Sequence, residues 1–188
     1  MIAAGCAREN VVPRAEAAHA ASSAQVTPTR VIETEHFILP LPGGYADATS
    51  ELRTESPRLS VVLRASTMSN GYQPTIVVRR VPLPGGTFAD PSACTQTGKG
   101  IVTGGTEEPG TGGTLLSASI IDGPLGKACQ IHVRAPEGIA LITELYKPGN
   151  TALAPKDVWL MICNHAYGDI DAEKSCRFAL AGFRFRDR

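Results

Sequence analysis

Cysteine and histidine are the residues of this chain best suited to chemistry, as metal ligands, nucleophiles or disulfide partners. The 188-residue sequence has five cysteines, and none is spaced as C-x-x-C, so the paired ligands of a zinc ribbon are missing. In the triplet CNH, Cys163 and His165 would share one face of a strand. Zinc needs about four convergent ligands, and a disulfide at Cys163 would remove its sulfur. We therefore expect no metal site and no other cofactor.

Four of the cysteines lie in the body of the chain, an even number that fits two structural disulfides. They are Cys94, Cys129, Cys163 and Cys176. Two disulfides would indicate an oxidising compartment such as the periplasm or the cell exterior. The alternative is four buried free thiols in a cytosolic protein. Four cysteines allow three connectivities, and we favour Cys163 with Cys176, which closes a short loop, and Cys94 with Cys129.

Neither a catalytic serine nor a phosphate-binding loop is indicated. The chain has no G-x-S-x-G elbow, and the glycine-rich segment GTEEPGTGG has Thr111 where a Walker loop needs lysine. His132 alternates with the apolar Ile131 and Val133, which predicts an ordinary solvent-side position on a strand. We therefore expect no catalytic residue. An enzyme with an unrecognised site near His132, His165 or the glycine-rich loop is the alternative.

The charge and hydropathy of the chain narrow the classes of partner. Lysine and arginine together number 18, as do aspartate and glutamate, so the formal net charge is zero. A nucleic-acid-binding domain usually carries a basic excess, and we expect no nucleic-acid partner. Hydrophobic residues make up 43% of the chain, enough for a core. The longest apolar runs, such as VWLMIC, are too short to span a bilayer, which predicts a soluble domain.

Small residues lead into Cys6 in the segment AAGC, which resembles a bacterial lipobox, where such a cysteine becomes the lipid-modified N-terminus. Ala3 stands where leucine is usual, and the apolar core of a signal peptide is missing. We expect residues 1–5 to be the remnant of a truncated signal, and the Ala/Ser-rich stretch up to residue 29 to be a flexible tether. This predicts a periplasmic or extracellular domain whose membrane contact is a lipid anchor at Cys6.

The body of the chain reads as a series of strands separated by glycine, proline and asparagine. Connections this short favour an antiparallel meander, because parallel crossovers need about a dozen residues or more. The expected strands span residues 31–39, 58–66, 74–83, 114–123, 127–136, 138–149 and 157–166, with a short one in the terminal FRFR.

Two helices are expected between or after these strands. Asp90 can cap the first, which must be short because Gly98 and Gly100 follow. Asp169 or Asp171 can cap the second, near the end of the chain. Strands and helices in this order indicate an α+β fold.

The order of elements resembles the PsbP/Mog1-like superfamily, and its secreted, lipoprotein-type members look closest. The resemblance rests on FILPLPGGYADAT near the start of the body and on the terminal CRFALAGFRF. It implies one α+β domain over residues 30–188, with a twisted antiparallel sheet of about six or seven strands flanked by two or so helices. The superfamily consists largely of binding and assembly factors without a shared set of catalytic residues.

These observations together predict a non-catalytic domain, envelope-attached or secreted, that binds or assembles a partner. The partner would be a protein or an envelope component of unknown identity. A chaperone-like module that shields apolar segments of client proteins is a further alternative, beside the enzyme.

Overall fold

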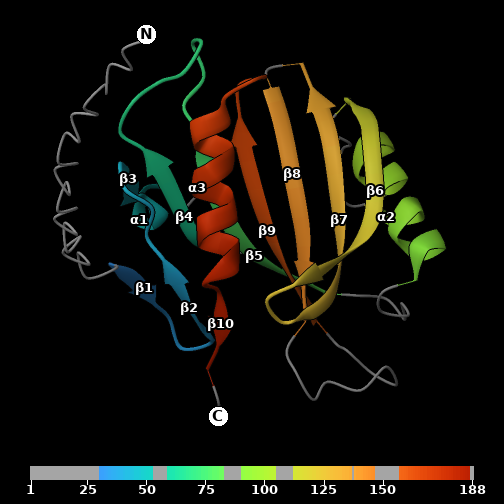
Figure 1. The fold of residues 1–188 in the computed structure, drawn as a ribbon, viewed down its shortest axis with the longest axis horizontal. Coiled ribbons are helices and arrows are strands. Elements are labelled where there is room, and N and C mark those ends of the chain that lie inside the picture. Colours follow the sequence, from blue (N-terminus) through green and yellow to red (C-terminus); the bar gives the residue numbers. More distant parts are fainter. Residues whose placement is uncertain are drawn as a thin grey trace, which may run out of the picture.

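The computed structural model describes residues 30–52, 59–82, 90–104, 112–136, 138–146 and 157–186. These ranges contain ten strands and three helices, a mixed α+β fold (Figure 1). The elements are β1 (Val31–Glu33), β2 (Phe37–Pro40), β3 (Tyr45–Asp47), α1 (Thr49–Leu52), β4 (Leu59–Ala65), β5 (Thr75–Pro82), α2 (Pro91–Thr103), β6 (Thr114–Gly123), β7 (Gly126–Ala135), β8 (Gly138–Leu145), β9 (Asp157–His165), α3 (Ile170–Ala181) and β10 (Arg184–Phe185). No helix within these ranges is long and apolar enough to cross a membrane.

The strands form two antiparallel sheets. Seven of them are ordered β3-β4-β5-β9-β8-β7-β6, and three are ordered β1-β2-β10. The large sheet consists of two meanders, β3 to β5 and β6 to β9, which join where β5 pairs with β9. The α+β class and the antiparallel pairing agree with the sequence prediction, as does a sheet of about six or seven strands, although β3 was not among the strands predicted. The second, three-stranded sheet was not predicted.

The predicted strand at residues 31–39 is wrong, because the chain reverses in the middle of it. The Thr34 hydroxyl accepts hydrogen bonds from the backbone N–H groups of His36, at 3.2 Å, and Phe37, at 3.0 Å. This turn makes β1 and β2 an antiparallel hairpin. β2 then also pairs with β10, which brings two distant parts of the chain side by side.

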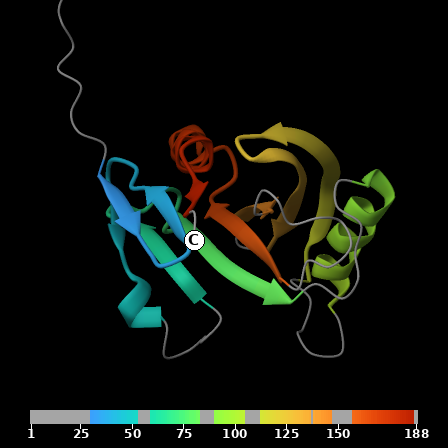
Figure 2. The same ribbon diagram turned by 90° about the horizontal axis from the view of Figure 1, so that it is seen from below.

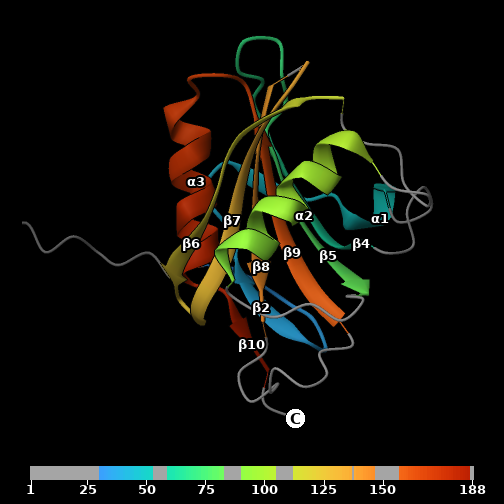
Figure 3. The same cartoon turned by 90° about the vertical axis from the view of Figure 1, so that its right-hand side faces the viewer.

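The two longer helices cover opposite faces of the large sheet, as Figures 2 and 3 show. α3 and the small sheet lie over one face, and α2 packs on β6 and β7 at the other. β9 has apolar residues on both faces, with Trp159 and Met161 on the α3 side and Val158 and Leu160 on the α2 side. The unbroken apolar run VWLMIC is therefore typical of a strand that is buried on both faces.

Each of the two longer helices begins at a capping aspartate. Asp90 accepts a hydrogen bond from the backbone N–H of Ser92 at 2.9 Å, and Asp169 accepts one from that of Ala172 at 3.0 Å. These bonds satisfy backbone donors that have no partner within the helix. Asp90 was predicted as a cap, and of the two candidates for α3 the structure uses Asp169.

One disulfide joins each of the two longer helices to the sheet. Cys94 of α2 is bonded to Cys129 of β7, and Cys163 of β9 is bonded to Cys176 of α3. The Cα–Cα distances are 5.5 and 6.0 Å. This is the connectivity favoured from the sequence, and it fixes both covering layers to the sheet between them.

The prediction that α2 must be short is wrong, since the helix continues through both glycines to Thr103. Gly98 is buried against the sheet, where an added Cβ would lie 2.9 Å from Leu115 Cδ1 and 3.3 Å from Ile131 Cγ2. The absence of a side chain allows α2 to approach β6 and β7 closely. Packing against the sheet offsets the roughly 1 kcal/mol that a glycine costs in a helix.

We expect Gly98→Leu to lower the free energy of unfolding by about 1–3 kcal/mol, because the new side chain would overpack this contact. Gly100→Leu is the matched control on the same helix. Apart from its chain neighbours and the backbone of its own helix, no atom lies within 4 Å of the position of its Cβ, so leucine should raise the free energy of unfolding by up to about 1 kcal/mol. Urea titration of both variants measures the difference. Equal effects at the two sites would contradict the packing argument.

Candidate binding groove

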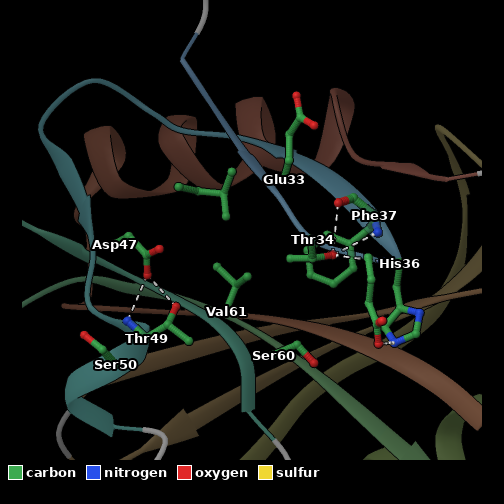
Figure 4. Close-up of a pocket in the computed structure, with 11 residues that line it drawn as sticks. Glu33, Thr34, His36, Phe37, Asp47, Thr49, Ser50, Ser60 and Val61 are labelled. Atoms are coloured by element: carbon green, nitrogen blue, oxygen red, sulfur yellow. Dashed lines mark hydrogen bonds and ion pairs between the residues drawn. The ribbon is translucent and has the colours of Figure 1, made fainter.

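An open groove lies between the β1–β2 hairpin and the segment β3–α1–β4 (Figure 4). Its volume is about 810 Å³. A second, smaller pocket of about 310 Å³ lies between the β7–β8 turn and Tyr72. The larger groove is lined by Ile32, Glu33, Thr34, Glu35, His36, Phe37, Asp47, Thr49, Ser50, Ser60 and Val61.

The floor of the groove is apolar and belongs to the core. Ile32, Phe37 and Val61 supply it, and Phe37 is completely buried. The Phe37 ring stacks on Phe183 at a centroid distance of 5.1 Å and meets Trp159 edge-on at 5.2 Å. The floor is therefore held by residues of both sheets.

One wall is the turn between β1 and β2. The His36 ring lies 5.3 Å from the Trp159 ring, and its Nε2 is 2.7 Å from Glu35 Oε1. Thr34 is engaged in the backbone hydrogen bonds of the turn. The ring contact with Trp159 and the hydrogen bonds of Thr34 therefore fix the position of this wall.

The opposite wall comes from β3 and α1. Asp47 accepts a hydrogen bond from the backbone N–H of Thr49 at 2.8 Å, and it also accepts one from the Thr49 hydroxyl. That hydroxyl in turn accepts a hydrogen bond from the backbone N–H of Val62 in β4, at 2.9 Å. The Asp47 carboxylate is therefore exposed but held at the rim.

The groove is acidic. Glu33, Glu35 and Asp47 contribute carboxylates, and no lysine or arginine lines it. Arg186, which follows β10, is ion-paired with Glu33 from outside the groove. The Asp47 carboxylate is exposed at the rim, so the groove presents negative charge there.

The residues predicted from sequence lie elsewhere. Cys6 and the tether fall outside the described residues, as does most of the glycine-rich segment with Thr111. The four cysteines of the body are bonded in pairs. Within the described ranges, no group of three or more histidine, cysteine, aspartate and glutamate residues could hold a metal ion.

His132 and His165 both lie on the α3 side of the sheet. His132 lies on the face opposite Ile131 and Val133, as predicted, and its side chain is partly buried there. Burial lowers the pKa of His132, and the charge of Glu173 on α3 opposes this shift. His165 is buried, with its Nδ1 2.9 Å from the carbonyl oxygen of Ala166. α3 covers this face of the sheet. The alternation of polar and apolar residues along a strand does not predict that a helix packs there.

A buried acid lies on the other face of the sheet. Glu144 of β8 is 6% exposed and accepts a hydrogen bond from the Tyr146 hydroxyl. Burial raises the pKa of Glu144, although the hydrogen bond partly offsets the shift. Folding therefore favours the protonated form of this carboxyl group.

This raised pKa predicts a loss of stability as the pH rises above 4.5, the ordinary pKa of the group, because the unfolded chain can ionise Glu144 more readily. The side chain introduced by Glu144→Gln cannot ionise, but it can still accept a hydrogen bond from the Tyr146 hydroxyl. We expect the stability of the variant relative to the unmodified protein to increase between pH 4.5 and 7.5, as measured by urea midpoints. A difference independent of pH would disprove the assignment, and Glu51→Gln at an exposed site is the control.

These features define a class of domain, an α+β fold with two disulfides whose antiparallel sheet is covered on both faces and borders an open groove. The fold is similar to the crystal structure of LpqN, involved in cell envelope biogenesis of Mycobacterium tuberculosis, with a TM-score of 0.50 at 12% sequence identity. The match covers 87% of this chain and 88% of LpqN. At this identity the likeness concerns the fold. No protein-family model and no curated protein matches the chain.

Proposed function

We propose that this chain is a non-catalytic binding or assembly domain of the bacterial cell envelope, with a PsbP/Mog1-like fold and a lipid anchor at Cys6. The observation that carries the proposal is the open groove, whose apolar floor and acidic walls suit binding. The two threonines that line the groove, Thr34 and Thr49, accept hydrogen bonds from backbone N–H groups, so their hydroxyls stabilise the local fold.

Two further observations support an envelope location. LpqN, which has a similar fold, is involved in cell envelope biogenesis. The structure also has two disulfides, and disulfides persist in oxidising compartments outside the cytosol.

Cell fractionation tests the location. The gene, with its native upstream sequence, is expressed in its bacterial host, and we expect the protein in the envelope fraction with a lipid on Cys6. Cys6→Ala should release it from the membrane. An unmodified Cys6 thiol on a cytoplasmic protein would refute the location. Turnover in a hydrolase screen, if one serine or histidine substitution abolished it, would refute the non-catalytic role.

A chaperone-like role is favoured by a group of apolar side chains at one end of the molecule. Met68, Tyr167 and Ile170 are 66%, 70% and 64% exposed. The Ser69 hydroxyl hydrogen-bonds to Asp169, which brings the β4–β5 loop to the start of α3. Exposed apolar residues gathered in this way often mark interaction sites.

This second role predicts that the protein slows the aggregation of a reduced, unfolded client, measured by light scattering. Met68→Ser combined with Ile170→Ser should remove the effect. Leu116→Ser, at an exposed apolar residue of β6, is the control. Full protection by the double variant would exclude these residues as the client site.

A further inference from the structure

The outer edge of β6 is the longest unpaired edge among the described strands. β6 has 10 residues and ends the large sheet, and no described strand pairs with its far side. β3, at the opposite end of that sheet, has three residues. α2 packs on one face of β6, where the side chains of Leu115 and Ala118 lie close to Gly98 (Figure 3). The helix therefore covers a face of this strand and not its edge.

The register of the β6–β7 hairpin determines which backbone groups face outward. Gly123 pairs with Gly126 across a two-residue turn. Across so short a turn, two opposite residues can pair only by exchanging both of their hydrogen bonds. Pairs that do and do not exchange such bonds then alternate along the hairpin. The N–H and C=O groups of Ala118, Ile120 and Asp122 therefore point away from β7.

The sequence of this edge leaves it open to another strand. Native sheets commonly protect an edge with lysine, proline or a bulge. β6 contains no lysine, arginine or proline. Its register shifts between Leu115 and Ser117, before the three residues whose backbone groups face outward. The part of β6 that follows this bulge is thus a regular edge with unblocked donors and acceptors.

We propose that the edge of β6 pairs with β6 of a second copy of this chain, antiparallel and about a two-fold axis at Ile120. Ile120 of each copy then pairs with its equivalent, and Ala118 of each copy pairs with Asp122 of the other. Each pair exchanges two N–H···O=C bonds. The interface is isologous, and the large sheets of the two copies become one continuous sheet. This pairing is independent of the binding role proposed above.

The residues of β6 suit a second copy better than other strands. In the proposed register the Asp122 carboxylate lies opposite an alanine, so no like charges face each other, and Ser119 lies opposite Ile121. Pairing of β6 with β3 would align only three residues and would build an open array, whereas the two-fold pairing closes after two copies. A strand of another protein could form the same backbone bonds, but the single charged side chain of β6, Asp122, gives little basis for selecting one.

Sedimentation equilibrium of the full chain tests the proposal. The protein carries Cys6→Ala, so that a disulfide between two tails cannot imitate association, and the other cysteines stay oxidised. Because pairing of single strands buries little surface, we expect reversible dimerisation with a dissociation constant of about 1–100 µM. A protein that stays monomeric up to about 1 mM would overturn the proposal. Assemblies that keep growing with concentration would also overturn it, because an isologous pair is closed.

Asp122→Pro tests the pairing of the backbone. Proline removes the outward N–H but none of the hydrogen bonds between β6 and β7. We expect the dissociation constant to rise about tenfold or more, since each copy loses one interchain hydrogen bond. Asp122→Ala keeps the N–H and should change the dissociation constant less than about twofold. Urea midpoints establish that both variants are folded. Equal dimerisation of the two variants would overturn pairing through this edge.

Disulfide trapping tests the register. Ser119 of one copy should lie opposite Ile121 of the other in a pair without mutual hydrogen bonds, with Cα atoms about 4.5 Å apart, close enough for a disulfide. A mixture of Ser119→Cys and Ile121→Cys proteins, both with Cys6→Ala, should form a linked heterodimer in a glutathione redox buffer. Each variant alone should link far less, because equivalent residues then lie diagonally. Equal linkage of the mixture and of either variant alone would overturn the register.

Discussion

Replacing Phe37 with alanine should lower the free energy of unfolding by about 3–5 kcal/mol, the range for large aromatic residues in a core. Phe37 is completely buried between Phe183 and Trp159, with ring centroids 5.1 and 5.2 Å away. The substitution removes these contacts and leaves a cavity where the two sheets meet. Urea unfolding monitored by circular dichroism measures the loss.

Phe178→Ala is the control, because this phenylalanine is 45% exposed on α3. Its loss should cost well below 1 kcal/mol, as is usual for surface positions. If the two variants lost similar stability, Phe37 would not be the centre of this core. A moderate loss at Phe37 would still leave folded protein, in which the groove should have lost part of its floor.

Replacing Cys163 and Cys176 together with alanine should lower the free energy of unfolding by about 3 kcal/mol. Their disulfide has a sequence separation of 13, and closing a loop of about this length restricts the unfolded chain by that amount in the chain-entropy model. The unmodified protein, unfolded in urea with and without a reductant, should show a loss in the same direction.

Peptide mapping without a reductant provides the independent check on both disulfides. It should recover the Cys163 peptide joined to that of Cys176, and the Cys94 peptide joined to that of Cys129. Free thiols at all four positions in native protein would contradict the structure at these sites and remove the argument for an oxidising compartment.

Much of the fold could be predicted because its signals are local. Apolar runs bounded by glycine, proline or asparagine gave the long strands of the large sheet to within a few residues, except that β8 ends before the expected strand. Asp90 and Asp169 are capping residues whose chemistry acts within three positions. The superfamily resemblance anticipated an antiparallel sheet flanked by helices, although the family itself stays a proposal.

The groove could not be predicted because its walls meet only in the folded protein. Glu35 lies in the turn between β1 and β2 and Asp47 at the end of β3, and nothing in the sequence indicates that they line opposite walls of one groove. The signal that could have helped is Thr34, whose hydroxyl can stabilise a turn. The length of α2 was predicted wrongly for a similar reason. Gly98 is tolerated in the helix because it packs closely on strands that are distant in the sequence.

The pairing of β2 with β10 constrains the order in which the molecule can mature. Phe37 lies early in the domain, but Phe183, on which its ring stacks, emerges from the ribosome or the export channel among the last described residues. During synthesis or export, the β6–β9 meander can form from neighbouring segments, whereas the small sheet must await the end of the chain. The floor of the groove, to which Phe37 belongs, is therefore complete only once the last strand of the domain has paired with β2.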